Sequence, residues 1–348
     1  MNKQFGALRG SAILIVVVHH SIDLGILGPQ DLGYPPFEGW GSFVLAVLSF
    51  LGVFAVPTFL FISGCFAAYA TRGDPPQLSW KAVWASLRRL LVPYILWSSV
   101  FYIVVWLQRD ESYTLAEYAK NLLVGYPFHF VPILALNYLL SPFLARALRR
   151  RPYLLVGAIA AYQGFLLIVR DPGIVGFSFP NWVNYLVPPV FGNPLAEWGV
   201  YFPLGLAYGL HAERMQSWLF QYRKLFLLAT VASFLVVIPP LRSVLNWPWM
   251  AYVCPVLFLL YAPSIKRNAI PLVRQLEVVG RKSYGLYLVH LIALDLVFLL
   301  LQSLVPDLLG WQAILQPLLF LLALGIPLLL MSGLASRPTR SIYRFLFG

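Results

Sequence analysis

The sequence is short of the residues that keep a folded chain in water. Only 11% of its 348 residues are charged, and Asp and Glu together number 13. Hydrophobic residues make up 60% of the chain, whereas soluble domains are roughly 45–50% apolar and about 25% charged. A fold that faces water on all sides cannot bury this much apolar surface. The shortage of charge therefore excludes an ordinary soluble domain and predicts an integral membrane protein.

Cysteine is also scarce. Cys65 and Cys254 are the only two cysteines, and each lies in an apolar run. Two thiols are too few for a cysteine-based metal cage or a disulfide framework, and we interpret both as packing residues. No other pattern in the sequence indicates a bound group, so we expect no metal site and no tightly bound cofactor.

The chain instead contains many long apolar runs, separated by Pro, Gly and charged residues. A bilayer core about 30 Å thick is crossed by about 20 helical residues. The pattern predicts an all-α, polytopic transmembrane bundle, formed by a single domain over residues 1–348 with about ten transmembrane helices. The expected helices cover residues 10–27, 46–70, 90–108, 130–146, 153–169, 196–211, 225–240, 249–264, 283–304 and 312–334. Several of them are expected to be broken by proline, at Pro57, Pro132, Pro142 and Pro203.

Basic residues are distributed unequally between alternate loops. The loops on one side contain only Arg109, Lys120, Arg170 and Arg242, so 21 of the 25 Lys and Arg residues lie on the side of the N-terminus. Cytoplasmic loops carry the excess of basic residues, which predicts that both termini are cytoplasmic. The net charge of +12 then reflects topology and attraction to anionic membrane lipids. We expect no nucleic-acid partner.

The first helix contains several ionisable residues, which are costly inside a membrane and are functional candidates for that reason. His20 follows Arg9 by eleven residues, about 16 Å along a helix axis, so Arg9 is expected at the cytoplasmic end and His20 near mid-membrane. Asp23 lies within one turn of both His19 and His20 and can accept a ring N–H from either. A His20 supported in this way is suited to act as a general base on a hydroxyl that attacks a thioester. The alternative is a histidine satisfied by a backbone carbonyl, and the spacing favours neither.

Two arginines precede the third expected helix. Arg88 and Arg89 stand just before Pro93, and together with Arg9 they can place guanidinium groups at the cytoplasmic mouth of a cavity. Guanidinium groups pair well with phosphate oxygens, which makes these residues candidates for binding the phosphates of an acyl-CoA. The same residues are also typical determinants of membrane topology.

Four further polar side chains lie at the ends of expected helices. His129 is at the outer end of the fourth helix, and Tyr284, Tyr287 and His290 fall in the first two turns of the ninth. Each can donate or accept a hydrogen bond in an apolar environment. We take them as candidate substrate-binding residues.

Five segments resemble one protein family in the same order. The first helix, LRGSAILIVVVHH (residues 8–20), resembles the opening of the acyltransferase 3 family of bacterial membrane proteins, in which an Arg and a His are separated by ten residues. The other four segments are FLFISG (59–64), RRLLVPYILW (88–97), FHFVPILALNYLLSP (128–142) and SYGLYLVH (283–290).

The resemblance implies a multi-pass enzyme of the bacterial cytoplasmic (inner) membrane. Members of the family use cytoplasmic acyl-CoA, usually acetyl-CoA, to acylate hydroxyl groups of carbohydrates, glycolipids or similar acceptors. It implies that Arg9 organises the donor and that His20 acts as a base or as an acyl relay. A proton-coupled transporter or exporter, in which His20 and Asp23 relay protons, is the alternative from another class. A structural subunit of a glycan-assembly complex is a third.

Overall fold

The structure is a bundle of helices. It is a computed structural model that describes residues 4–71, 77–109, 111–174, 176, 179–238, 247, 249–336 and 338–348. Within these residues the regular elements are helical and no β-strand occurs, so the predicted all-α class is confirmed. The single domain over residues 1–348 stays a prediction.

The helices follow one another with short connections. The longest are α1 (Gln4–Asp31), α4 (Trp80–Arg109), α6 (Phe130–Arg150), α7 (Pro152–Arg170), α15 (Ser283–Leu304) and α16 (Gln312–Gly333). One further long segment consists of α2 (Trp40–Phe50), the 3-10 helix η1 (Leu51–Phe54) and α3 (Ala55–Tyr69). The shorter α-helices are α5 (Leu115–Val124), α8 (Gly192–Trp198), α9 (Tyr201–Leu210), α10 (Ala212–Gln221), α11 (Arg223–Val237), α13 (Met250–Tyr261), α14 (Val273–Arg281) and α17 (Arg340–Phe347). The remaining 3-10 helices are η2 (Pro172–Ile174), η3 (Asn181–Leu186), η4 (Ala262–Ser264), η5 (Arg267–Ala269) and η6 (Pro306–Gly310).

Seven helical segments of the described chain are long and apolar enough to cross a membrane, or up to eight if α10 and α11, which meet at a bend of 71°, are one span. The expected helix 196–211 is instead the two short helices α8 and α9. The expected helix 225–240 ends at Val237, and its last two residues, like Arg242, lie outside the described residues. The count of about ten is not confirmed, and the cytoplasmic location of the termini stays a prediction.

Three of the four prolines expected to break helices stand at helix starts. Pro57, Pro132 and Pro203 are the third residues of α3, α6 and α9, and Pro142 lies inside α6. The first N–H groups of a helix have no partner within it, so proline is tolerated there. A break precedes Pro57, where η1 joins α2 to α3, and another precedes Pro203, between α8 and α9. Helix α6 begins just before Pro132 and continues through Pro142, so the breaks expected there do not occur.

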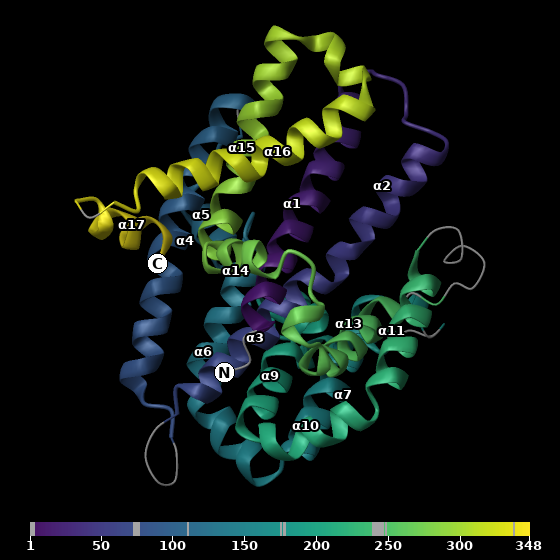
Figure 1. Ribbon diagram of the computed structural model, residues 1–348, viewed down its shortest axis with the longest axis vertical. Coiled ribbons are helices and arrows are strands. Elements are labelled where there is room, and N and C mark those ends of the chain that lie inside the picture. Colours follow the sequence, from purple (N-terminus) through teal and green to yellow (C-terminus); the bar gives the residue numbers. More distant parts are fainter. Residues whose placement is uncertain are drawn as a thin grey trace.

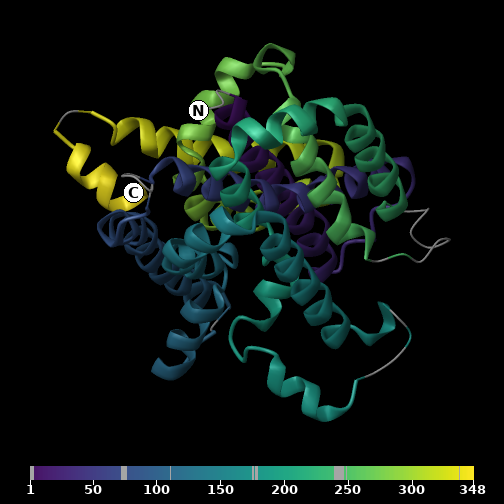
Figure 2. The same cartoon turned by 90° about the horizontal axis from the view of Figure 1, so that it is seen from below.

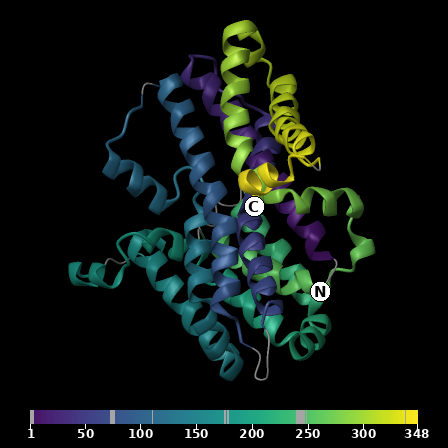
Figure 3. The same cartoon turned by 90° about the vertical axis from the view of Figure 1, so that its left-hand side faces the viewer.

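Helix α1 lies at the centre of the bundle. It packs against α2, α3, α14, α15 and α16, and Figure 1 shows it in purple between α2 and α15. The long helix α4, in blue, runs along another side of the bundle (Figure 3). The teal segment that contains η3 extends away from the helices at the bottom of Figure 2. The cavities described below are lined by the helices that surround α1.

Two helix crossings depend on glycine. A Cβ on Gly205 of α9 would lie 1.9 Å from the carbonyl oxygen of Phe61 in α3, and a Cβ on Gly10 of α1 would lie 2.0 Å from the carbonyl oxygen of Leu276 in α14. No side chain fits into either gap, and small residues are what allow helices in a membrane to approach this closely. The second crossing holds the start of α1 against α14, and α15 follows α14 directly.

Candidate active site

One cavity lies beside the first turns of α1, and we call it the arginine cavity. It has a volume of about 460 Å³ and is lined by Arg9 of α1, Arg89 of α4 and Arg281 of α14, with no Asp or Glu side chain among its described lining residues. Three cations without a neighbouring carboxylate side chain favour an anionic ligand. The structure thus brings Arg9 and Arg89 together, as expected from the sequence. Arg88, which is exposed like Arg89, does not line this cavity.

The crossing of α1 and α14 explains how two of these arginines come together. Gly10 stands directly after Arg9 and touches the backbone of α14, and a Cβ on Gly280 would lie 2.1 Å from the carbonyl oxygen of Gly6. Because the two backbones are in contact, Arg9 and Arg281 reach the same cavity from neighbouring helices. The glycine of the LRG motif therefore has a steric role, next to the arginine that lines the cavity.

The C-terminal helix α17 forms part of the wall of the arginine cavity. Phe347 lines the cavity and stacks on Trp97 of α4, with ring centroids 6.0 Å apart. The Trp97 Nε1–H donates to the carbonyl oxygen of Leu346 at 2.8 Å. Tyr284 also lines the cavity, and its hydroxyl donates to the carbonyl oxygen of Leu90. These contacts join α17 and α15 to α4 around the cavity.

A second cavity, of about 470 Å³, contains His19, His20 and His129 in its wall, and we call it the histidine cavity. His19 and His20 come from α1, and His129 directly precedes α6. The sequence placed His129 at the outer end of a helix, and the structure brings it to the same space as His20. Residues from α1 therefore line both cavities, with Arg9 in one and His20 in the other.

The wall of the histidine cavity also carries a fixed carboxylate and aromatic rings. Glu197, Trp198 and Tyr252 all line it. Arg170 Nη1 donates to Glu197 Oε1 at 2.7 Å, and Arg170 Nη2 donates to the Tyr252 hydroxyl at 2.8 Å. Aromatic faces beside oriented hydrogen-bonding groups suit a ligand with both apolar and hydroxyl surfaces. The sequence did not single out this network among the site residues, because its members lie far apart along the chain.

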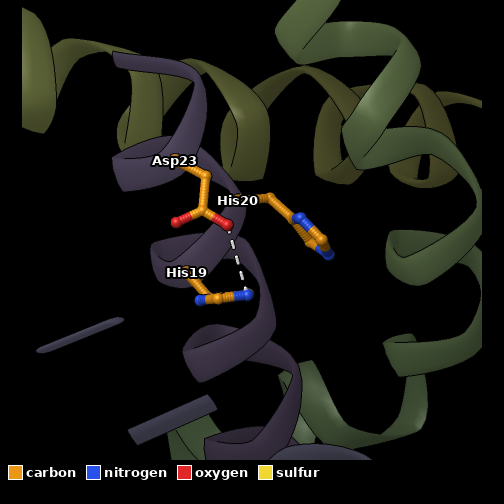
Figure 4. A group of neighbouring side chains, drawn as sticks. All are labelled: His19, His20 and Asp23. Carbon is orange, nitrogen blue, oxygen red and sulfur yellow. Dashed lines mark ion pairs between the residues drawn. The ribbon is translucent and has the colours of Figure 1, made fainter. Parts of the chain in front are cut away.

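Asp23 pairs with His19 and not with His20. His19 Nε2 lies 3.3 Å from Asp23 Oδ2, and the Ser49 hydroxyl contacts both His19 Nδ1 at 2.7 Å and Asp23 Oδ1 at 3.3 Å. Figure 4 shows this ion pair as a dashed line, with the ring of His20 projecting to the right of α1. The sequence allowed Asp23 to support either histidine, and the structure selects His19.

The ring of His20 lies close to that of a second buried histidine. His290 of α15 is completely buried, and its ring centroid is 5.3 Å from that of His20. Its Nδ1 lies 2.7 Å from the carbonyl oxygen of Tyr287. The ring next to His20 therefore comes from α15, whereas Asp23 lies on α1 with His20.

One aromatic pair separates the two cavities. Phe130 and Tyr287 are the residues that line both the arginine and the histidine cavity, and their ring centroids are 4.4 Å apart in an edge-to-face arrangement. Phe130 also stacks on Phe59, at 5.7 Å. The two cavities therefore meet at this pair, which we call the shared wall.

Three side chains of α1, His20 among them, form the one candidate metal site among the described residues. The ligand atoms of His19, His20 and Asp23 all lie within 4.8 Å of one another. Transition-metal ions need ligand atoms at about 2.0–2.2 Å, and His19 and Asp23 already contact each other and Ser49. The sequence gave no reason to expect a metal here, and its absence stays a prediction.

The sequence model of a family described as "Acyltransferase domain" matches residues 2–337, so the chain belongs to the acyltransferase 3 family. With its apolar helices, it is a multi-pass membrane protein of that family.

Curated relatives of the chain come from Staphylococcus aureus. The proteins of strains MSSA476 and MW2, each named "Probable poly-beta-1,6-N-acetyl-D-glucosamine export protein", are 23% identical over 352 residues. The alignments cover 98% of this chain and 94% of each relative. No solved structure matches the chain significantly.

Proposed function

We propose that this protein is a membrane-embedded O-acyltransferase that moves an acyl group, with acetyl as the first choice, from acyl-CoA to a hydroxyl of a carbohydrate, glycolipid or similar acceptor. The observation that carries the proposal is the pair of cavities that meet at the shared wall, with Arg9 lining one and His20 the other. A donor and an acceptor that enter from opposite sides would meet within reach of His20.

The arginine cavity is the proposed donor site. An acyl-CoA carries several phosphate groups, and Arg9, Arg89 and Arg281 supply guanidinium groups that can hold them. The thioester end of the donor would then extend towards Phe130 and Tyr287, away from the charged part of the cavity. No tightly bound cofactor is required, because acyl-CoA is the donor substrate.

The histidine cavity is the proposed acceptor site, and His20 the proposed base. His20 removes the proton from the acceptor hydroxyl as the oxygen bonds to the acyl carbon. The C–S bond of the thioester then breaks, and the sulfur leaves as the CoA thiol after taking the proton back from His20. The products are the O-acyl acceptor and CoA. If His20 instead acts as an acyl relay, its ring nitrogen first bonds to the acyl carbon as the C–S bond breaks and CoA leaves. The acceptor hydroxyl oxygen then bonds to the acyl carbon as this C–N bond breaks, and the hydroxyl proton balances the CoA thiol that was released.

The acceptor class is proposed from two observations. The curated relatives are named for the export of a polymer of N-acetylglucosamine, and the histidine cavity combines Trp198 and Tyr252 with the Glu197 carboxylate. Sugars present apolar ring faces and hydroxyl groups that such a wall can contact. We place the enzyme in the bacterial inner membrane, with the arginine cavity on the cytoplasmic side, where acyl-CoA is made.

Thiol release from acetyl-CoA tests this proposal. In nanodiscs, the purified protein is expected to cleave acetyl-CoA slowly without an acceptor, and His20→Ala to lower this rate by roughly 10²–10⁴-fold, the usual contribution of a general base. Thermal unfolding and gel filtration of both proteins control for folding. Thiol release that is equal in the two proteins, or absent across acyl-CoAs of several chain lengths, would contradict the proposal.

The name of the Staphylococcus aureus relatives also favours a second candidate, a proton-coupled exporter. The His19–Asp23–Ser49 cluster on α1 and α2 would then relay protons through the membrane. Proteoliposomes with a pH-sensitive dye inside distinguish the two candidates. Glycan-dependent proton flux without thiol release supports the exporter, whereas thiol release without flux supports the acyltransferase.

A further inference from the structure

His290 has one ring nitrogen with a fixed partner and one without. Its Nδ1 lies 2.7 Å from the carbonyl oxygen of Tyr287 and 3.2 Å from that of Leu286. Carbonyl oxygens only accept hydrogen bonds, so Nδ1 carries the proton of the neutral ring and Nε2 presents a lone pair. Nε2 is buried and has no hydrogen-bond partner among the described residues.

A buried acceptor of this kind is costly unless a donor reaches it. The ring next to it belongs to His20, with centroids 5.3 Å apart and planes inclined by 44°. His20 can supply an N–H, and its ring is joined by no hydrogen bond to the described residues around it. Asp23 contacts His19 and Ser49 instead.

We propose that His290 is a positioning residue for His20. The two rings are close enough that a turn of the His20 ring lets one of its N–H groups donate to His290 Nε2, which has no other partner among the described residues. This hydrogen bond fixes the tautomer of His20 and leaves its other ring nitrogen unprotonated towards the histidine cavity. A carboxylate orients the histidine of many catalytic sites in this way, and here a neutral imidazole on another helix takes that place. The effect of His290 on the reaction rate rests on the proposed function, whereas the pairing of the two histidines does not.

The same turn of α15 links this pair to the shared wall. Tyr287 supplies the carbonyl oxygen that fixes His290, and its side chain lines both cavities. The position of the His20 ring is thereby tied to the residues between donor and acceptor. Loss of His290 should therefore reduce turnover more than it reduces binding of the donor in the arginine cavity.

Kinetics of two His290 variants test the proposal. His290→Leu removes the acceptor while filling similar space, and His290→Gln retains an amide oxygen at about the position of Nε2. We expect His290→Leu to lower kcat for acyl transfer or thioester cleavage by about tenfold or more, as part of the roughly 10²–10⁴-fold effect of a general base. The KM for acetyl-CoA should stay within about twofold, because the donor phosphates lie in the other cavity. His290→Gln should recover most of the lost kcat.

His211→Leu is the matched control, because His211 also bonds a backbone carbonyl, that of Leu148 at 3.0 Å, and lines neither cavity. It should retain the wild-type kcat. Equal kcat for His290→Leu and wild type would overturn the proposal. So would a His290→Gln variant that folds and is as slow as His290→Leu, or a loss that occurs with Asp23→Asn and not with His290→Leu.

Nitrogen-15 NMR of histidine-labelled protein in nanodiscs gives a test that does not depend on activity. The wild type should show His290 protonated at Nδ1 and His20 as a single tautomer, with signals assigned by His20→Gln and His290→Gln. His290 protonated at Nε2 would overturn the proposal, even if His290→Leu does not fold. If the wild type transfers no acyl group, the proposed function fails, and these spectra alone decide whether the two histidines are paired.

Discussion

At the scale of single residues, the proposed chemistry depends on which cavity each of two side chains of α1 lines. Arg9 lines the arginine cavity and His20 the histidine cavity. This separation could be predicted from the sequence, because the rise of an α-helix is regular. The partner of His20 could not, because positions three and four residues away are both within reach on a helix. Contacts from other helices, Ser49 and His290, settle the arrangement.

A change at Arg9 that keeps its positive charge should weaken donor binding and leave the membrane topology unchanged. We expect Arg9→Lys to raise the KM for acetyl-CoA by roughly 10- to 100-fold, since a hydrogen bond to a charged group contributes roughly 1.5–3 kcal/mol and an ammonium group cannot replace the planar fork. Steady-state thiol release measures this. Arg88→Lys, at the exposed neighbour of Arg89, should change KM much less. Equal effects of the two variants would indicate that Arg9 only sets topology.

At the scale of helices, the long apolar runs predicted the bounds of the two long helices near the C-terminus well. The expected helix 283–304 has the bounds of α15, and 312–334 differs from α16 by one residue. The short helices α14 and α17 were not expected, because each is too short and too polar to give an apolar run. They are nevertheless what brings Arg281 and Phe347 to the arginine cavity.

The crossing of α3 and α9 should not tolerate a methyl group. Gly205→Ala would place its Cβ 1.9 Å from the carbonyl oxygen of Phe61, so the two helices must separate. Overpacking of this kind costs roughly 1–3 kcal/mol, and we expect a lower midpoint of thermal unfolding in detergent. Gly157→Ala in α7 is the control, because nothing lies within 4 Å of its Cβ. Equal midpoints for the two variants would contradict the close crossing.

At the scale of the whole molecule, the two cavities support the proposal of a reaction across the membrane. The positive-inside rule predicts that the side of Arg9 faces the cytoplasm, where the proposed donor is found. The histidine cavity would then receive an acceptor from the other side, and Phe130 and Tyr287 separate the two. The sequence predicted this arrangement only in outline, because the residues that line each cavity come from helices far apart along the chain.

Acyl transfer in inside-out membrane vesicles is the measurement that tests the central claim most directly. These vesicles expose the cytoplasmic face, so [14C]acetyl-CoA added outside reaches the arginine cavity while native acceptors are enclosed in the lumen. We predict that wild-type vesicles incorporate alkali-labile radiolabel into luminal carbohydrate or glycolipid and that His20→Ala vesicles with equal protein content do not. Incorporation that is the same with His20→Ala would contradict the account.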